Sequence, residues 1–131
     1  MRILIDTDVL LDVALHRPEF FEKSASVISW AESNPGQAAV AWHSISNLNY
    51  LIRPESRPFL RDLLEFVEVP ATGTGDMKVA LSARMPDLED AMQTAAALAF
   101  RANFIVTRNL EDYRHSAVRA LSPGEFLKLL R

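Results

Sequence analysis

Short apolar runs alternate along this chain with longer segments in which apolar residues recur every three or four positions. The short runs have the length and composition of strands that are buried on both faces of a sheet. The first is followed by a polar turn that starts at Asp6, and the third is closed by Pro70. Five strands are therefore expected, at residues 2–5, 38–41, 66–69, 103–107 and 118–121.

The segments between these strands have the periodicity of amphipathic helices. Apolar residues fall on one helical face between Glu19 and Ser33, between Phe59 and Val67, and between Leu88 and Ala99. Ser122 followed by Pro123 is typical of a helix N-cap and first helical residue, so a last helix is expected from there. Strands that alternate with helices predict an α/β fold whose mainly parallel sheet is covered on both faces.

Length and composition favour a single domain over residues 1–131. The chain is 49% hydrophobic and 24% charged, and no repeat or linker divides it. It has no cysteine, which excludes disulfides, thiol catalysis and cysteine-bound metals. No apolar run approaches the ~18 residues of a membrane helix, so no membrane association and a cytoplasmic location are expected. The net charge of −3 argues against binding nucleic acid through overall charge.

Aspartates occur where the predicted fold would bring them together. The carboxyl ends of parallel strands meet in one crevice, which is the usual ligand site of such sheets. Asp6 directly follows the first strand, Asp112 lies just beyond the fourth, and Asp87 and Asp90 open the alanine-rich helix. Carboxylates that converge repel one another unless a cation lies between them, and Mg²⁺ or Mn²⁺ prefers such oxygen ligands. The pattern therefore suggests metal-assisted hydrolysis of a phosphodiester.

Each of these residues also has a structural interpretation. Asp6 and Asp87 have the residue type and position of helix N-caps, and Asp90 would favour the dipole of its helix. Asn109 and Asp112 could be the cap and third residue of a short turn helix. Only their joint arrangement favours a functional site.

Four segments in order resemble the PIN domain family of metal-dependent ribonucleases, which includes VapC-type toxins of bacterial toxin–antitoxin pairs. They are residues 3–12, 87–97, 104–113 and 120–127. The resemblance implies a three-layer sandwich around a mainly parallel sheet of four to five strands. It also implies an RNA substrate, Mg²⁺ or Mn²⁺ as cofactor, a small antitoxin partner and a homodimer. Asp6, Asp90 and Asp112 would be the catalytic, metal-binding residues.

The second family motif departs from this pattern. Family members with four acids carry a glutamate on the helix after the second strand, where this chain has Asn47. An amide offers a metal a neutral oxygen and no charge, so cation binding would be weaker and activity could be lost. Asp8, Asp87 and Glu89 are candidates to compensate.

Other polar residues of the motifs would support the three aspartates. Asn47 and Asn109 would orient metal ligands or bound water, and Thr7 and Thr107 could supply hydroxyls behind them. Arg108, beside the expected site, is the candidate to contact a phosphate of the substrate.

Two rival functions follow from the same residues. A PIN domain with Asn47 could bind RNA or a protein without cutting. The opening segment 3–9 also resembles the nucleophile motif of haloacid-dehalogenase phosphatases, in which Asp6 would attack phosphorus and Asp8 act as acid and base. The rest of the chain argues against the phosphatase, since Ala80 stands where its second acidic motif needs an aspartate.

Overall fold

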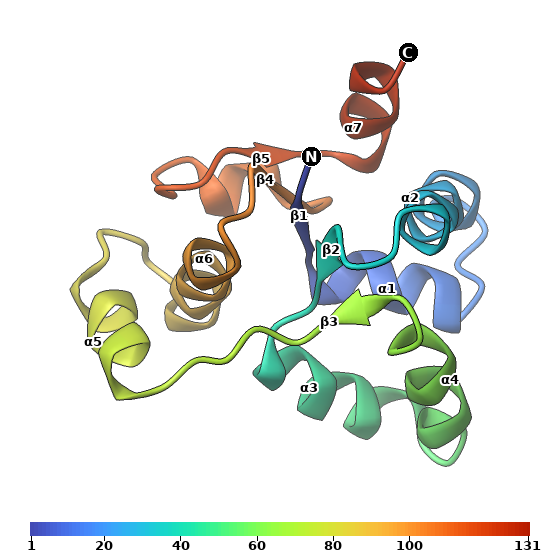
Figure 1. Ribbon diagram of the computed structural model, residues 1–131, viewed down its shortest axis with the longest axis horizontal. Helices are drawn as coiled ribbons and strands as arrows, with labels where there is room; N and C mark the ends of the chain where they lie inside the picture. Colours follow the sequence, from blue (N-terminus) through green and yellow to red (C-terminus); the bar gives the residue numbers. More distant parts are fainter.

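The computed structural model describes residues 1–131 and contains one sheet of five short parallel strands. Their order across the sheet is β3-β2-β1-β4-β5, so the chain starts in the middle strand (Figure 1). Every strand lies within a range that the sequence predicted. The strands are β1 (Ile3–Ile5), β2 (Ala38–Ala39), β3 (Val67–Glu68), β4 (Phe104–Val106) and β5 (Ala120–Leu121).

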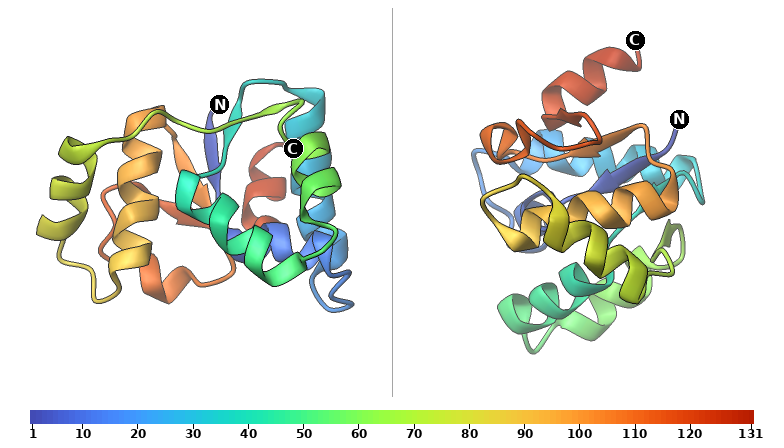
Figure 2. Two further views of the ribbon diagram at one scale, coloured as in Figure 1. Left: turned by 90° about the horizontal axis from the view of Figure 1, so that it is seen from below. Right: turned by 90° about the vertical axis from the view of Figure 1, so that its left-hand side faces the viewer.

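Helices cover both faces of this sheet, as expected for a three-layer α/β fold. In Figures 1 and 2, α5 and α6 lie on one side of the strands and the remaining α-helices on the other. The helices are α1 (Thr7–Ala14), α2 (Phe21–Ser33), α3 (Trp42–Ile52), α4 (Ser56–Leu63), α5 (Thr74–Ser82), α6 (Leu88–Phe100) and α7 (Pro123–Leu129), with a 3-10 helix η1 (Leu110–Tyr113).

The central strand shows how the two layers are filled. Successive side chains of a strand point to opposite faces. Ile3 and Ile5 accordingly belong to the larger core, beneath α1, α2, α3 and α7. Leu4 belongs to the smaller core, with Ala97 and Phe100 of α6. All three residues of β1 are fully buried, which explains why that strand has no alternating pattern in the sequence.

Two helical expectations need correction. The apolar face expected between Phe59 and Val67 spans two elements, because α4 ends at Leu63 and Val67 lies in β3. The stripe expected on α6 is buried at Ala91 and Ala95, but its first residue, Leu88, is 46% exposed. The reason is that α6 lies between the sheet and α5, so that two of its sides are buried rather than one.

The end of the chain follows the capping pattern closely. The Ser122 hydroxyl accepts a hydrogen bond from the Glu125 N–H, and the Glu125 carboxylate accepts one from the Ser122 N–H. Pro123 occupies the first turn of α7. None of the helices combines the length and the apolar character needed to cross a lipid bilayer.

The strand register brings distant residues to one edge of the sheet. Ile5 pairs with Val106, so Asp6 and Thr107, the next residue in each chain segment, are neighbours at the carboxyl edge. α6 leads into β4 and starts at that same edge, which places Asp90 there. The fold thus brings Asp6, Thr107 and the start of α6 to the edge of the sheet where the sequence predicted a crevice.

Candidate active site

The Asp6 carboxylate is the centre of a buried hydrogen-bond network. Its Oδ1 accepts from the Thr7 N–H at 2.8 Å and from the Gln93 Nε2 at 2.9 Å. Its Oδ2 accepts from the Thr107 Oγ1 at 2.8 Å and from the Tyr113 hydroxyl at 3.1 Å. Asp6 is 7% exposed and also caps α1, so the structural and functional interpretations both apply to it. None of its four donors is positively charged.

Gln93 connects Asp6 to α3. Its Nε2 also donates to the Ser44 Oγ at 2.8 Å, and Ser44 accepts from the Thr7 hydroxyl at 2.9 Å. Gln93 is completely buried, and its Oε1 has no hydrogen-bond partner. A buried amide that leaves one acceptor unpaired lowers stability, so the residue is held here by its contact with Asp6 rather than by packing alone.

Asp8 adds a second carboxylate to the same edge. Its Oδ2 accepts from the Arg108 N–H at 3.0 Å, whereas its buried Oδ1 has no partner. Burial, together with the neighbouring charge of Asp6, raises the pKa of Asp8 to about 6. Asp8 is therefore a half-buried acid whose negative charge is only partly compensated.

The start of α6 carries the next acids. The Asp87 side chain accepts from the Asp90 N–H at 3.1 Å and caps the helix, as its position suggested. Burial, followed by the charges of Asp87, Asp6 and Asp112, raises the pKa of Asp90 to about 6. The Tyr113 hydroxyl lies close enough to Asp90 to lower that pKa. Asp6 and Asp112 are therefore both near enough to Asp90 for their charges to act on it.

The residues expected to support the three aspartates differ in their burial and in their hydrogen bonds. The Asn109 N–H donates to the Thr107 Oγ1 at 3.0 Å, but its side chain is exposed. Glu89 is exposed and its charge acts on His43. Asn47 is half-buried on α3, one turn beyond Ser44, and makes no hydrogen bond there. The structure thus joins Thr7 and Thr107 to Asp6 directly but leaves the Asn47 amide free.

Arg108 is engaged in a different contact from the one expected. Its Nε donates to the Asp12 Oδ2 at 2.8 Å and its Nη2 to the Oδ1 at 3.1 Å, and its guanidinium lies 3.8 Å from the centre of the Phe20 ring. Asp12 is fully buried and is also contacted by Arg17. The Nε and Nη2 of Arg108 are thus engaged by Asp12, and this geometry favours a role in holding the loop after β4.

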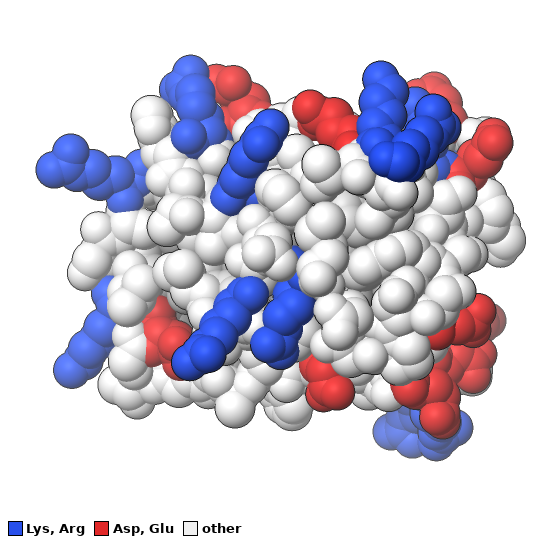
Figure 3. Space-filling model, turned by 45° about the horizontal axis from the view of Figure 1, so that its top comes forward, with Lys and Arg blue, Asp and Glu red and all other residues white.

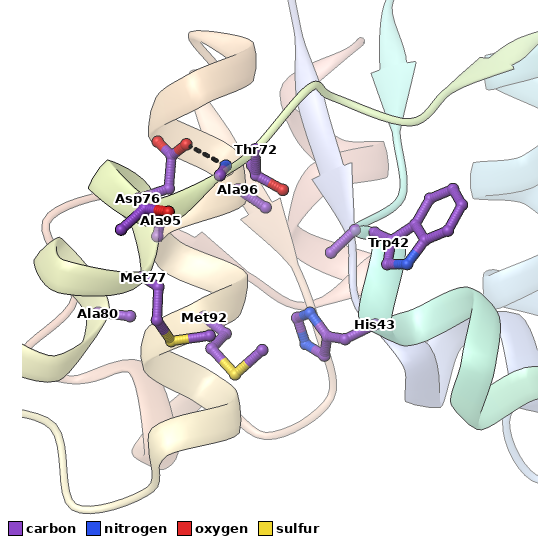
Figure 4. Close-up of a pocket in the computed structure, with 12 residues that line it drawn as sticks. Trp42, His43, Thr72, Asp76, Met77, Ala80, Met92, Ala95 and Ala96 are labelled. Atoms are coloured by element: carbon purple, nitrogen blue, oxygen red, sulfur yellow. Dashed lines mark hydrogen bonds between the residues drawn. The ribbon is translucent and has the colours of Figure 1, made fainter.

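A cavity of about 380 Å³ lies beside the acids, between α3, α5 and α6. In Figure 4, the His43 ring of α3 points into it toward Met92 of α6, and Met77 of α5 faces it from the same side as Met92. Burial lowers the pKa of His43, so its ring is neutral at physiological pH. The cavity is mainly apolar, in contrast to the carboxylates next to it.

The surface charge is mixed. On the face shown in Figure 3, basic and acidic side chains are interspersed around a broad uncharged area. The chain has a net charge of −3. On this face, contacts with a polyanion would therefore depend on individual side chains rather than on a basic patch.

The sequence matches the PIN domain family over residues 2–111, most of the chain. The chain belongs to the PIN domain family. This confirms the resemblance that the motifs suggested. No curated protein matches the chain.

Solved structures of toxin–antitoxin systems share this PIN fold. The VapBC2 complex of Rickettsia felis is 14% identical with a TM-score of 0.71, and the match covers 93% of this chain and 98% of that one. A toxin–antitoxin complex of Klebsiella pneumoniae is 18% identical with a TM-score of 0.67, over 92% and 97%. FitAcB of Neisseria gonorrhoeae is 16% identical with a TM-score of 0.61, over 93% and 98%. At these identities the likeness establishes the fold.

The candidate metal ligands of this PIN domain have the chemistry that a hard divalent cation prefers. Its ligands would be carboxylate oxygens that lack a positive partner, and the buried Oδ1 of Asp8 lacks any partner. The set is not assembled for binding in this conformation. No three acidic or histidine side chains are close enough to share an ion, and both oxygens of Asp6 are occupied by donors.

Three residues of this PIN domain network were missed in the sequence. Gln93 carried a signal, because it is a polar residue within the buried alanine-rich helix. Tyr113 and Asp12 lie inside motifs that were recognised, but nothing in the sequence distinguished them from surface residues. Their partners lie 107 and 96 residues away, respectively, so only the sheet register reveals them.

Proposed function

We propose that this PIN domain is a divalent-metal-dependent endoribonuclease that acts as the toxin of a toxin–antitoxin pair. The observation that carries the proposal is the group of carboxylates around Asp6 that has no positive partner. Asp8 and Asp90 both have a pKa raised to about 6 by burial and by neighbouring acids. The folded protein thus retains repulsion between these carboxylates, and a cation bound among them would relieve it.

Asp6, Asp90 and Asp112 would hold the cation, with Asn47 supplying a neutral oxygen and Asp8 a further carboxylate. Bound there, Mg²⁺ or Mn²⁺ supplies an activated water and compensates the charge that develops at phosphorus. Asp87 and Glu89, at the start of α6, would add to the negative potential that attracts the cation.

The protein's own contribution is to fix the carboxylates before the substrate arrives. The Thr107 hydroxyl and the Gln93 amide orient Asp6, and the Asp87 cap fixes the first turn of α6 and with it Asp90. The Thr107 hydroxyl in turn accepts from the Asn109 N–H, which ties the loop after β4 to the site. Orientation of this kind lowers the reorganisation needed during the reaction.

The comparison with solved structures also supports a proposal about partners. One of the matched structures is described as a toxin–antitoxin complex, and two are described as bound to DNA fragments. We expect this chain to bind a small antitoxin and to form a homodimer, with residues 1–131 acting as one domain. A cytoplasmic location fits an RNA substrate.

One rival remains. A PIN domain that binds RNA or a protein without cutting is favoured by Asn47 and by the fully occupied oxygens of Asp6. Membership of the PIN family replaces the haloacid-dehalogenase hypothesis.

The test is cleavage of single-stranded and structured RNA with Mn²⁺ or Mg²⁺. We expect cutting by the parent, inhibition by EDTA, and a loss of roughly 100-fold or more in Asp6→Asn and Asp90→Asn, as for removal of one group that stabilises transition-state charge. Asp62→Asn makes the same chemical change at an exposed position of α4 and should cut normally.

The outcomes separate the two functions. Equal cutting by all four proteins would indicate a contaminating nuclease and would reject the assignment. RNA binding by the parent without cleavage at any metal concentration would favour the non-cutting PIN domain.

A further inference from the structure

The Tyr113 hydroxyl occupies an unusual position between two acids. It donates to the Asp6 Oδ2 at 3.1 Å and lies close enough to Asp90 to change its pKa. Tyr113 is the last residue of η1 and is 3% exposed. Burial, followed by the charges of Asp6 and Asp90, raises the pKa of its hydroxyl far above its ordinary value, so the group stays a neutral donor.

Asp6 cannot accept a further ligand while all four donors are in place. The two oxygens of a carboxylate offer about four lone-pair positions, and Asp6 uses them for two donors on each oxygen. A cation that binds Asp6 must therefore displace one of these donors.

Tyr113 is the donor most easily displaced. The Thr7 N–H is fixed by the backbone of α1, and the Thr107 hydroxyl and the Gln93 amide have other partners in the network. Tyr113 makes the longest of the four hydrogen bonds, and its hydroxyl has no other acceptor within hydrogen-bond distance. Its O–H can also rotate away without moving the ring.

We propose that the Tyr113 hydroxyl takes the place of the cation at Asp6 in the metal-free protein: it donates to the Asp6 Oδ2 and leaves Asp6 when a divalent ion binds. This inference rests on the proposed metal-dependent function. Tyr113 is a positioning residue that sets the metal concentration at which the site forms. The same hydrogen bond stabilises the metal-free fold and competes with the metal.

The test compares Tyr113→Phe with the parent in two measurements, Mn²⁺ binding followed by the electron paramagnetic resonance of free Mn²⁺, and thermal unfolding. In EDTA we expect the variant to unfold roughly 5 °C lower, because Asp6 loses a donor. We expect it to bind Mn²⁺ about five- to tenfold more tightly, because nothing has to be displaced. At saturating Mn²⁺ the difference in melting temperature should close, since both bound forms then have the same contacts.

Tyr50→Phe is the matched control. Tyr50 is the only other tyrosine, is 70% exposed on α3, and contacts Arg53 through a ring that phenylalanine retains. It should match the parent in both measurements. Weaker or unchanged Mn²⁺ binding by Tyr113→Phe, beside normal binding by the parent, would overturn this inference alone. Absence of Mn²⁺ binding in both would overturn the proposed function as well.

A measurement on the unmodified protein does not depend on the folding of a variant. With ¹³C at the Cζ of both tyrosines, we expect a Mg²⁺ titration to shift the Tyr113 resonance and to leave that of Tyr50 in place. A Tyr113 resonance that stays fixed while calorimetry shows Mg²⁺ binding would overturn the inference.

Discussion

Two buried aspartates, Asp12 and Asp6, lie at opposite ends of α1 and differ in whether a positive side chain pairs with them. Asp12 is completely buried and receives two hydrogen bonds from the Arg108 guanidinium, with Arg17 at 3.5 Å. Asp6 is almost as buried, yet its four donors are neutral and its charge acts on a neighbouring acid, Asp8. One site is balanced in charge and the other is not.

The difference distinguishes a carboxylate that serves the fold from carboxylates that are available to a ligand. A buried carboxylate needs a positive partner to offset its lost hydration, and Asp12 has one. At the carboxyl edge of the sheet the same chain leaves Asp6, Asp8 and Asp90 without such a partner. The excess negative charge is therefore a property of that edge and not of aspartates in this fold generally.

Removal of the partner of Asp12 should produce the largest effect. We expect Arg108→Ala to lower the free energy of unfolding by about 3 kcal/mol, because it leaves a buried charge with a neutral donor, the Ser24 hydroxyl, and only the longer ion pair to Arg17. Urea unfolding at pH 7 measures this directly.

Arg114→Ala is the control for removal of an arginine near the same loop. Its pair with Glu111 has side chains 65% and 78% exposed, so the loss should stay below about 1 kcal/mol. A similarly small loss for Arg108→Ala would mean that Asp12 is not balanced by this pair, and the contrast with Asp6 would disappear.

The sequence predicted the position of the site better than its internal contacts. Asp6 and Thr107 follow buried strands, and parallel strands end at one edge, so their meeting could be expected from pattern alone. The partners of Asp12 and Asp6 could not. Arg108 was expected to bind phosphate because it lies beside the site in sequence, whereas the path of the loop after β4 turns it toward Asp12.

The rotation of α6 limits prediction in the same way. Periodicity placed Leu88 on its buried face, but packing against both the sheet and α5 turns Leu88 outward and Gln93 inward. Small residues on all sides of a helix leave its orientation undetermined by hydrophobic pattern. The orientation is instead set by neighbours that are remote in sequence, and it decides that Gln93 reaches Asp6.

The stability of the metal-free protein should depend on pH through Asp90, and the substitution Asp90→Asn should remove that dependence. Asp90 has a pKa of about 6 in the fold against 3.8 ordinarily, so the folded state binds more protons between these values and metal-free stability falls as pH rises through them. Because Asp90 is partly exposed, solvent screening reduces this contribution to about 1 kcal/mol. Asp90→Asn should therefore gain about that much relative to the parent between pH 4 and pH 7.

Urea unfolding in EDTA at the two pH values checks the difference, with Asp62→Asn as the same substitution at an exposed site of α4. An Asp90→Asn variant that loses stability relative to the parent as pH rises would show that the Asp90 charge is compensated in the fold. The carboxyl edge around Asp6 would then be balanced in charge, as the surroundings of Asp12 are.

The smallest expected effect concerns Asn47, which tests how far the unbalanced site extends along α3. We expect Asn47→Glu to tighten Mn²⁺ binding about fivefold and to lower metal-free stability by about 0.5 kcal/mol, since a further acid adds both a charged ligand and repulsion. Asn47→Gln gives the side-chain length of glutamate without its charge and should do neither. Calorimetric titration with Mn²⁺ and urea unfolding in EDTA measure the two effects. If the two variants bind Mn²⁺ equally, a charge at position 47 does not act on the site around Asp6. The ligands of the cation then come from the strand ends and α6 alone.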